Sequence, residues 1–471
     1  MPRIPYKTPA KGTSVVGDAI RERRSPRGLT PLDQTLLNAP EIANGWNTLL
    51  GAVRNRNSLP DDIRELMILR VAARNSACFE WIHHAHVGTD AGLTNQQLTI
   101  IRDLYTPLPT PAAPGVLSPF QAAALRFADA STFSVNVPQS ILDELKEHLK
   151  DDQQLLEATA VAATYNMVSR LLVTLDVGDM GAISVPLPET EQTEHDVEVD
   201  DGVKLHVRVA KRDDASPWLV FVNSLMTNQK MWEGVLPRLS KKYNLVTYDQ
   251  RGHGKSSVPP KPCTLEVLAG DIATILTKLS IPTPVHAVIG VSQGGATTLA
   301  LAQHHPRLFS RLVACDTQAT SPAANAAAWD ERIALARNAG SMVPLADVTV
   351  PRWFPGGATS EFNAGGRRAH FIHDMIATTP VEGFAAGAAA LQGYDVLPGL
   401  ADKLKGGDIG KKVLLVAGER DGALPGVLKG LADKLKSDGV DARFEQIQGA
   451  GHLPMVDATQ PWLDVVEDFL A

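Results

Sequence analysis

One short pattern restricts this chain more than any other: an apolar run, His286 to Val291, that breaks at Gly290-x-Ser292-x-Gly294. The run predicts a buried strand, and the small residues from Ala296 to Ala300 predict a helix directly after it. Small neighbours let the backbone turn tightly between strand and helix, so that the serine hydroxyl is exposed. The pattern therefore predicts a nucleophile at Ser292.

The partners that a serine nucleophile needs follow in the chain. On a turn of this kind the expected order is serine, orienting acid and then histidine. An apolar run over 413–417 leads into a turn with Asp421 at its tip, and a glycine-rich loop presents His452. We therefore predict a triad of Ser292, Asp421 and His452, with Asp316 as the rival acid.

The composition is that of a globular protein, with 44% hydrophobic and 21% charged residues. A net charge of −7 argues against a nucleic-acid partner. Three scattered cysteines argue against a disulfide framework and for a reducing compartment. The sequence contains no signal-peptide pattern and no apolar run of membrane-spanning length. We therefore expect a cytoplasmic enzyme that acts on a small molecule away from membranes.

The periodicity changes along the chain, which predicts two domains. Residues 1–30 predict an irregular arm, 31–180 an all-α domain, and the polar, proline-bearing stretch 181–196 a linker. From 197 to 471, short apolar runs alternate with helical stretches, which is typical of a mostly parallel, doubly wound α/β sheet. An insertion at about 317–407 breaks this alternation and predicts a helical cap over the carboxyl ends of the strands.

The second domain resembles the α/β-hydrolase family and, within it, the 3-oxoadipate enol-lactonases. Two positions depart from the lactonases: Met226, where glycine is common, and Gln293, where methionine is usual. The resemblance implies the α/β-hydrolase fold and lactone hydrolysis that requires neither a metal nor an organic cofactor. It rests on the stretches Phe221-Val222-Asn223-Ser224-Leu225 and Tyr248-Asp249-Gln250-Arg251-Gly252-His253-Gly254, and on the cap residues Trp329, Arg332 and Trp353-Phe354.

The chemistry of a lactonase adds further expected contacts. The backbone N–H groups of Leu225 and Gln293 are predicted to hold the oxyanion. A lactone that carries carboxylates needs a cation near the serine, and Arg332 is our choice. The remaining predicted substrate contacts are Trp353, Asn223 and Ser224.

A polar cluster lies in the helical domain around Glu65, Glu80, His84 and His86. Glu80 and His84 are four residues apart, so they share one helical face and predict a carboxylate–imidazole pair for proton transfer. A buried pair with a purely structural role would give the same spacing. A metal site at His84 and His86 is disfavoured, because residues two apart cannot share a helix face.

The helical domain, over about residues 30–180, resembles the carboxymuconolactone decarboxylase-like (AhpD-like) family. Peroxidase members of that family carry a Cys-x-x-Cys pair where this chain has Ala77 and Glu80, which argues against thiol peroxidase chemistry. The resemblance implies that Glu80 and His84, together with Glu65, supply acid and base, and that the chain forms a homo-oligomer. It rests on Arg64-Glu65-Leu66-x-Ile68-Leu69, Cys78-Phe79-Glu80-Trp81-x-x-His84 and Tyr165-Asn166-Met167-Val168-Ser169-Arg170-Leu171-Leu172.

The two resemblances imply successive steps of one pathway. We hypothesise a bifunctional enzyme that decarboxylates 4-carboxymuconolactone to an enol-lactone and opens the enol-lactone to 3-oxoadipate. Two alternatives stay open. The hydrolase domain acts on another ester, lactone or C–C bond while the helical domain only oligomerises, or the chain is a ligand sensor that binds more than it turns over.

Overall fold

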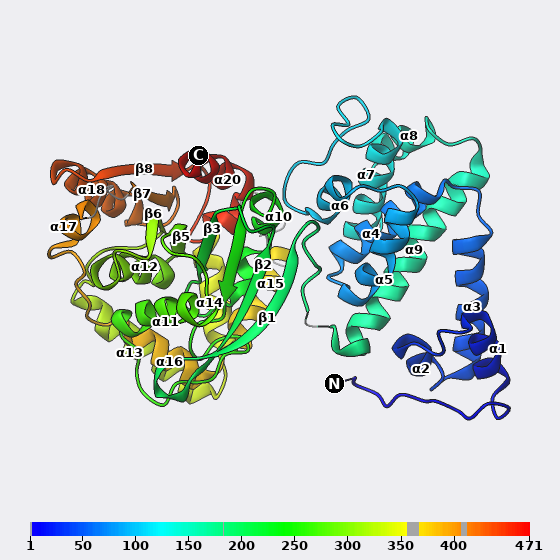
Figure 1. Ribbon diagram of the computed structural model, residues 1–471, viewed down its shortest axis with the longest axis horizontal. Helices are drawn as coiled ribbons and strands as arrows, with labels where there is room; N and C mark the ends of the chain where they lie inside the picture. The colour runs from blue at the N-terminus through cyan, green and yellow to red at the C-terminus, as the bar shows by residue number, and fades with distance from the viewer. Residues whose placement is uncertain (1, 182, 356–366, 407–411) are drawn as a thin grey trace. The chain divides into compact units, whose positions relative to one another are not determined.

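The computed structural model describes residues 2–181, 183–355, 367–406 and 412–471 (Figure 1). The internal contacts divide the chain into two compact units, Met1–Glu189 and Thr190–Ala471. The first is helical and the second is built on one sheet, as the change of periodicity predicts. None of the described helices is long and apolar enough to cross a membrane.

Helix α4 is the centre of the first unit, because its residues from Ile63 to Ala73 are all buried. Helices α5, α6, α7 and α9 pack around it. The helices of the unit are α1 (Val15–Arg24), α2 (Pro31–Leu36), α3 (Pro40–Asn55), α4 (Asp61–Arg74), α5 (Cys78–Asp90), α6 (Asn95–Arg102), α7 (Pro119–Phe133), α8 (Gln139–Lys146) and α9 (Asp152–Thr174).

The arm predicted to be irregular over 1–30 contains helix α1. The Ser14 side chain accepts a hydrogen bond from the Gly17 N–H and so caps the helix. Asp18 in the first turn and arginines in the last turn suit the helix dipole. The prediction failed because the high Pro, Arg and Gly content of the whole segment is typical of irregular structure, although the helix within it is well capped.

A buried arginine ties the central helix of the first unit to its neighbours. Arg70 on α4 is fully buried, and its Nε lies 2.6 Å from Asp129 Oδ1 on α7. The same guanidinium donates to the carbonyl oxygens of Ile101 and Asp103, at 2.8 and 2.5 Å. These contacts satisfy a charge that burial would otherwise make very costly.

The second unit contains an eight-stranded sheet in the order β1-β2-β4-β3-β5-β6-β7-β8. The β1–β2 and β2–β4 pairs are antiparallel, and the other pairs are parallel. The strands are β1 (Glu191–Glu198), β2 (Lys204–Lys211), β3 (Trp218–Val222), β4 (Asn244–Tyr248), β5 (Val285–Val291), β6 (Phe309–Cys315), β7 (Lys412–Gly418) and β8 (Asp441–Ile447).

Both faces of the sheet are covered. Helices α11, α12, α17 and α18 share one buried core with strand residues such as Val220 and Val288. Trp232 lies with its ring 5.1 Å from that of Phe221 and 6.2 Å from that of Trp462 on α20. The helices outside the cap are α10 (Leu236–Leu239), α11 (Leu265–Lys278), α12 (Gln293–His304), α17 (Leu400–Lys405), α18 (Leu424–Ser437), α19 (Pro454–Asp457) and α20 (Thr459–Leu470).

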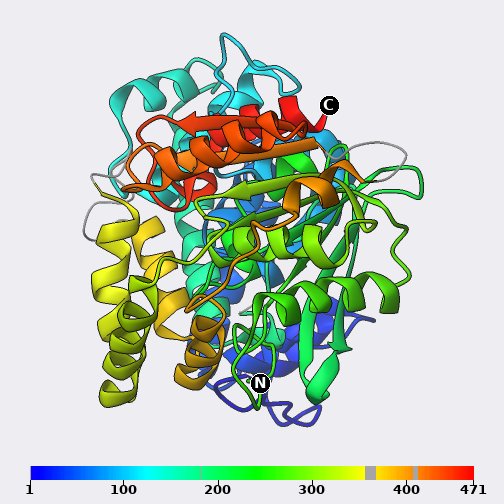
Figure 2. The same ribbon diagram turned by 90° about the vertical axis from the view of Figure 1, so that its left-hand side faces the viewer.

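Helices inserted between β6 and β7 form the predicted cap, and Figure 2 shows them grouped beside the sheet. The last helix of the predicted range, α17, packs on α12 as part of the sheet layer. Residues 356–366 and 407 of that range lie outside the described residues. The cap helices are α13 (Ala324–Ala339), α14 (Val343–Trp353), α15 (Arg367–Ala377) and α16 (Val381–Ala389).

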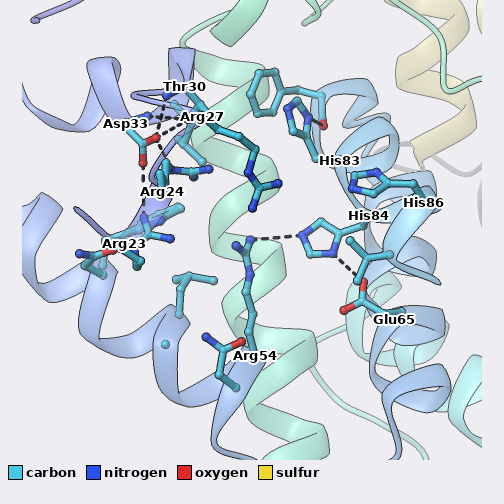
Figure 3. A pocket seen from close by; sticks show the side chains of 18 of the residues that line it. Arg23, Arg24, Arg27, Thr30, Asp33, Arg54, Glu65, His83, His84 and His86 are labelled. Carbon is cyan, nitrogen blue, oxygen red and sulfur yellow. Dashed lines mark hydrogen bonds and ion pairs between the residues drawn. The ribbon is translucent and has the colours of Figure 1, made fainter. Parts of the chain in front are cut away.

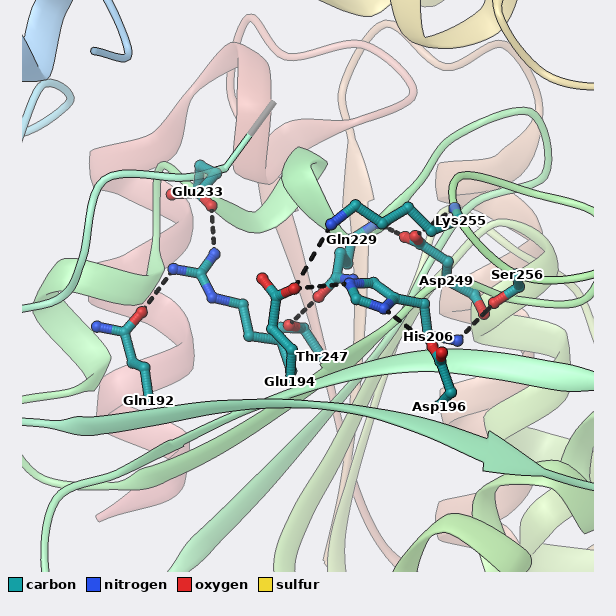
Figure 4. A network of polar contacts seen from close by, with 11 residues as sticks. Gln192, Glu194, Asp196, His206, Gln229, Glu233, Thr247, Asp249, Lys255 and Ser256 are labelled. Atoms are coloured by element: carbon teal, nitrogen blue, oxygen red, sulfur yellow. Dashed lines mark hydrogen bonds and ion pairs between the residues drawn. The ribbon is translucent and has the colours of Figure 1, made fainter. Parts of the chain in front are cut away.

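Residues 191–196 of the predicted linker, 181–196, are not a linker but the start of strand β1. Polar cross-strand contacts stabilise this strand where apolar alternation is missing (Figure 4). His206 of β2 lies between two carboxylates of β1, 3.4 Å from Glu194 and 3.5 Å from Asp196. Because the segment is polar, its composition resembles that of a linker, although its backbone pairs as a strand.

Helix α12 approaches the strands beneath it at glycine positions. A Cβ atom on Gly294 would lie 2.1 Å from the carbonyl oxygen of Val222 in β3. A Cβ atom on Gly290 in β5 would lie 2.2 Å from the carbonyl oxygen of Gly294. Both distances are far below van der Waals contact, so only glycine permits this packing.

We predict that Arg70→Met lowers the free energy of unfolding of the helical unit by about 3 kcal/mol, because Asp129 loses a partner and two carbonyls lose their donor. Urea unfolding followed by circular dichroism measures the change. The control is Arg126→Met, which breaks the more exposed ion pair with Glu144 and should cost less than about 1 kcal/mol. Equal costs for the two variants would contradict the prediction.

We predict that Gly294→Ala destabilises the sheet unit by about 3 kcal/mol, because the new methyl group collides with backbone that cannot move aside. Gly270→Ala on α11 is the matched control, since its Cβ would meet no atom within 4 Å. That helix-interior change should be neutral or stabilise by up to about 1 kcal/mol. Thermal or urea denaturation compares the two, and a Gly294→Ala protein as stable as the control would refute the packing argument.

Candidate active sites

The turn between β5 and α12 holds Ser292 in an unusual backbone conformation, with φ 57° and ψ −118°. The serine N–H donates to the carbonyl oxygen of Cys315, the last residue of β6, at 2.8 Å. A non-glycine residue at positive φ costs about 1–3 kcal/mol and persists where the surrounding structure enforces it. Here that conformation directs Ser292 into a pocket at the carboxyl ends of the strands.

Two loops that follow neighbouring strands bring His452 and Asp421 together. The His452 Nδ1 atom lies 2.6 Å from Asp421 Oδ2. The His452 ring stacks on Trp353 at 5.2 Å, and its backbone N–H donates to the Trp353 carbonyl oxygen at 2.8 Å. A carboxylate on Nδ1 assigns the proton to that nitrogen and leaves Nε2 as an acceptor, which is the state a general base needs.

The pKa of Asp421 lies below its usual range. Burial by itself would raise this pKa, but the charge and hydrogen bond of His452 favour the ionised form and outweigh burial. Asp421 is therefore suited to orient the histidine as an anion.

A cavity of about 240 Å³ brings most of the predicted hydrolase residues together. Its position at the carboxyl ends of parallel strands is the usual place for a site in an open α/β sheet. The predicted site residues that line this cavity are Ser224, Leu225, Ser292, Gln293, Arg332, Trp353, Asp421 and His452.

The predicted oxyanion donors lie in the wall of this cavity. In the part of the chain that the structure describes, neither the Leu225 nor the Gln293 N–H has an acceptor. The Gln293 side chain donates to the Gly387 carbonyl oxygen at 2.5 Å and so fixes the first turn of α12. Next to Leu225, the Met226 N–H donates to His253 Nε2 at 3.1 Å. Burial lowers the pKa of His253 to about 4, so this histidine is neutral and holds the loop.

Asn223 corrects our prediction of a substrate contact. Its amide is fully buried, donates to the Tyr248 carbonyl oxygen at 2.6 Å and accepts from Trp232 Nε1 at 2.8 Å. Both ends of the side chain are used inside the fold. The family pattern marks this asparagine because it holds the loop that presents Ser224 and Leu225.

Two arginines of the cap line the hydrolase cavity. The Arg332 guanidinium lies 4.7 Å above the Trp329 ring, a cation–π contact that keeps it at the cavity wall. The second cation is Arg352, directly before Trp353; sequence alone favours a solvent-exposed side chain for this residue, as for the other basic residues of the cap, from which only Arg332 was selected. A cavity with two guanidinium groups suits a substrate that carries a carboxylate.

In the helical unit, the predicted pairing of Glu80 with His84 is wrong. The carboxylate on His84 is that of Glu65, whose Oε2 lies 2.7 Å from His84 Nδ1. Glu80 points instead to α9, where Ser169 Oγ donates to its Oε2 at 2.8 Å. Burial raises the pKa of Glu80 well above its usual value, which favours the neutral carboxyl group. Residues four apart share a face of α5, but α4 and α9 decide which partner each one meets.

The other ring nitrogen of His84 meets Arg54, which no predicted motif contains, and Tyr165, which stands in a matched family motif without an assigned role. Its Nε2 lies 3.2 Å from an Arg54 guanidinium nitrogen and 3.2 Å from the Tyr165 hydroxyl. Burial lowers the pKa of His84, and the contact with Glu65 opposes that effect only in part. Because a guanidinium only donates, Nε2 is an acceptor and the ring is neutral, with its proton on Nδ1.

A cavity of about 380 Å³ adjoins this histidine, and arginines of the N-terminal arm line it (Figure 3). Burial together with the charges of Arg24 and Arg54 lowers the pKa of Arg23, which indicates excess positive charge. Arg24 is paired with Asp33 at 2.6 Å. The basic run of residues 21–27 is the sequence signal that could have identified this wall. The charged lining residues are Arg23, Arg24, Arg27, Asp33, Arg54, Arg64 and Glu65.

Each of the two units contains a match to a known protein family. Residues 217–459 match the family described as alpha/beta hydrolase fold. Residues 40–122 match the carboxymuconolactone decarboxylase family. The arm that lines the second cavity lies outside that match.

The chain is also similar to curated hydrolases and to solved hydrolase structures. The chain is 35% identical to 3-oxoadipate enol-lactonase 2 of Acinetobacter baylyi over 205 residues, which is 44% of this chain and 72% of that protein. The enol-lactonase structure from Burkholderia xenovorans LB400 is 31% identical, with a TM-score of 0.51, covering 57% of this chain and 97% of that one. A hydrolase structure from Pseudomonas aeruginosa is 30% identical, with a TM-score of 0.53 and coverages of 59% and 98%. The chain therefore belongs to the alpha/beta hydrolase fold family, and its helical unit carries a carboxymuconolactone decarboxylase family domain.

Proposed function

We propose that the chain is a bifunctional enzyme that decarboxylates 4-carboxymuconolactone and hydrolyses the resulting 3-oxoadipate enol-lactone. One observation carries the proposal: each unit has a carboxylate–histidine pair beside a cavity lined by arginines. The first substrate carries two carboxylates and the second carries one, so cations suit both. The relatives named 3-oxoadipate enol-lactonase support the second step, and the decarboxylase family match supports the first.

In the hydrolase unit, His452 Nε2 takes the proton of the Ser292 hydroxyl as the oxygen attacks the lactone carbonyl. The N–H groups of Leu225 and Gln293 stabilise the oxyanion of the tetrahedral intermediate. The ring C–O bond then breaks, and the leaving enol oxygen takes the proton from His452. Water, deprotonated by the same histidine, releases the acyl group from Ser292, and the enol becomes the ketone of 3-oxoadipate.

In the helical unit, the C–C bond to the ring carboxylate breaks and its electron pair passes into a dienolate that ends on the lactone carbonyl oxygen. The Arg54 guanidinium stabilises that negative oxygen. His84 takes a proton from solvent at Nε2 and delivers it to the ring carbon next to the carbonyl, while Glu65 stabilises the transient imidazolium. One proton is consumed for each carbon dioxide released.

The decisive experiment follows carbon dioxide and 3-oxoadipate after 4-carboxymuconolactone is added to the wild-type protein and to Ser292→Ala. The wild type should form both products. Ser292→Ala should release carbon dioxide, accumulate enol-lactone and hydrolyse it at least about 10³-fold more slowly, because the nucleophile is missing. Absence of both products from the wild type would end the pathway proposal and leave a hydrolase of another substrate.

We predict that Glu65→Gln lowers the rate of decarboxylation about 100-fold, because the amide cannot stabilise a protonated His84. Added enol-lactone should still be hydrolysed at the wild-type rate. Glu80→Gln is the matched control and should stay within about threefold, because a carboxyl group that is already neutral is replaced by a neutral amide.

Mixing Ser292→Ala with Glu65→Gln should restore 3-oxoadipate formation, since each variant supplies the step that the other lacks. Slower decarboxylation by Glu80→Gln than by Glu65→Gln would show that the roles of the two glutamates are exchanged.

A further inference from the structure

A second buried carboxyl group lies against the acid of the hydrolase site. Asp316 follows β6, has only 1% of its surface exposed and adopts a positive φ of 46°. Its Oδ1 accepts from the Gly418 N–H at 2.8 Å, and its own N–H donates to the Val416 carbonyl oxygen at 2.9 Å. These contacts with β7 fix the direction of the carboxyl group.

One carboxylate oxygen each of Asp316 and Asp421 and one ring nitrogen of His452 all lie within 4.8 Å of one another. The second oxygen of Asp316, Oδ2, is buried and meets no hydrogen-bond partner among the described residues. Two ionised carboxylates this close and this buried would repel each other strongly. A proton on Asp316 removes the repulsion and turns the unpartnered oxygen into a donor toward Asp421.

The electrostatic surroundings agree with this placement of the proton. Burial and the charge of Asp421 raise the pKa of Asp316 well above its usual value. The Asp421 carboxylate faces both His452 and the cation Arg352, which favour its charge. Cys315, beside Asp316, is buried, and burial raises the pKa of its thiol, so it adds no charge.

We propose that Asp316 is a positioning residue of the hydrolase site: as a neutral acid it donates a hydrogen bond to Asp421 and holds that carboxylate on His452. Asp316 and Asp421 together then carry one negative charge. Asp421 keeps its charge for the imidazolium that forms during turnover, and it cannot rotate away from Nδ1. This inference rests on the proposed serine-hydrolase function.

Three variants test the proposal with p-nitrophenyl acetate and with enol-lactone as substrates. Asp316→Asn keeps an acceptor for Gly418 and a donor for Asp421, so kcat/KM should stay within about threefold of wild type. The midpoint of the acidic limb of the pH–rate profile should also stay, because no charge is removed. Asp316→Leu lacks the donor and should lose about 10–100-fold in kcat/KM. Asp421→Asn should lose far more, about 10⁴-fold in kcat.

The pH profile separates this role from a merely structural one. If Asp316 were ionised, Asp316→Asn would remove a negative charge near the base and move the acidic midpoint down by about one pH unit or more. The control is Asp433→Asn on α18, which removes an exposed carboxylate that is paired with Lys429 and screened by solvent. It should leave the midpoint in place.

Several results would overturn the proposal. They are a lowered midpoint in Asp316→Asn, equal activity of Asp316→Leu and Asp316→Asn in equally folded proteins, and tolerance of Asp421→Asn but not of Asp316→Asn. Loss of activity in a chelator that an added divalent cation restores would also do so, because a cation would then bridge the carboxylates.

A readout without turnover keeps the inference separate from the proposed function. Infrared difference spectra between wild type and Asp316→Asn at neutral pH should show the loss of a carboxylic-acid C=O band. Loss of an ionised carboxylate band instead would refute a neutral Asp316. If the wild-type protein hydrolyses neither ester nor lactone, the proposed function fails, and the infrared result still decides the protonation of Asp316.

Discussion

The hydrolase site depends on a close approach of backbone to backbone. Helix α12 reaches β3 and β5 so closely that a Cβ atom on Gly294 would lie 2.1 Å from the Val222 carbonyl oxygen. This approach forces the tight turn, the turn gives Ser292 its positive φ, and the helix start that follows leaves the Gln293 N–H without an acceptor among the described residues. The proposed nucleophile and the proposed oxyanion donor are thus two results of one steric condition.

The two units have unrelated folds, but in both a carboxylate lies against a histidine in the same way. A carboxylate lies on Nδ1 in both units, at 2.6 Å from Asp421 to His452 and at 2.7 Å from Glu65 to His84. Each carboxylate fixes the tautomer and leaves Nε2 as an acceptor. In the helical unit that acceptor meets Arg54, so the proposed base lies beside a cation.

Local sequence pattern predicted much of the fold and selected the residues that meet at the candidate hydrolase site. Ser292, Asp421 and His452 follow strands that are apolar enough to be recognised, and parallel strands bring their carboxyl ends to one edge. Strand β1 lies in the segment predicted as a linker because its pairing is polar, and the residues of β8 are mostly half-buried or exposed. Neither strand shows the apolar run that identifies a buried strand.

The helical site was less predictable, because its contacts join different helices. The spacing of Glu80 and His84 shows that they share a face of α5, but packing against α4 and α9 selects Glu65 and Ser169 as their partners. The contact between Arg54 and Tyr165 joins positions far apart in the chain. A pattern within one helix holds no information on such neighbours.

The polar pairing of β1 has a consequence for how copies of this chain can meet. An edge strand offers unpaired N–H and C=O groups to any other sheet, and charged side chains along it oppose that pairing. Strand β1 carries Glu194 and Asp196, and the opposite edge strand β8 carries Arg443 and Glu445. These charges oppose growth of the sheet from molecule to molecule at either edge, which favours helices or loops as the surfaces through which copies of this chain would join.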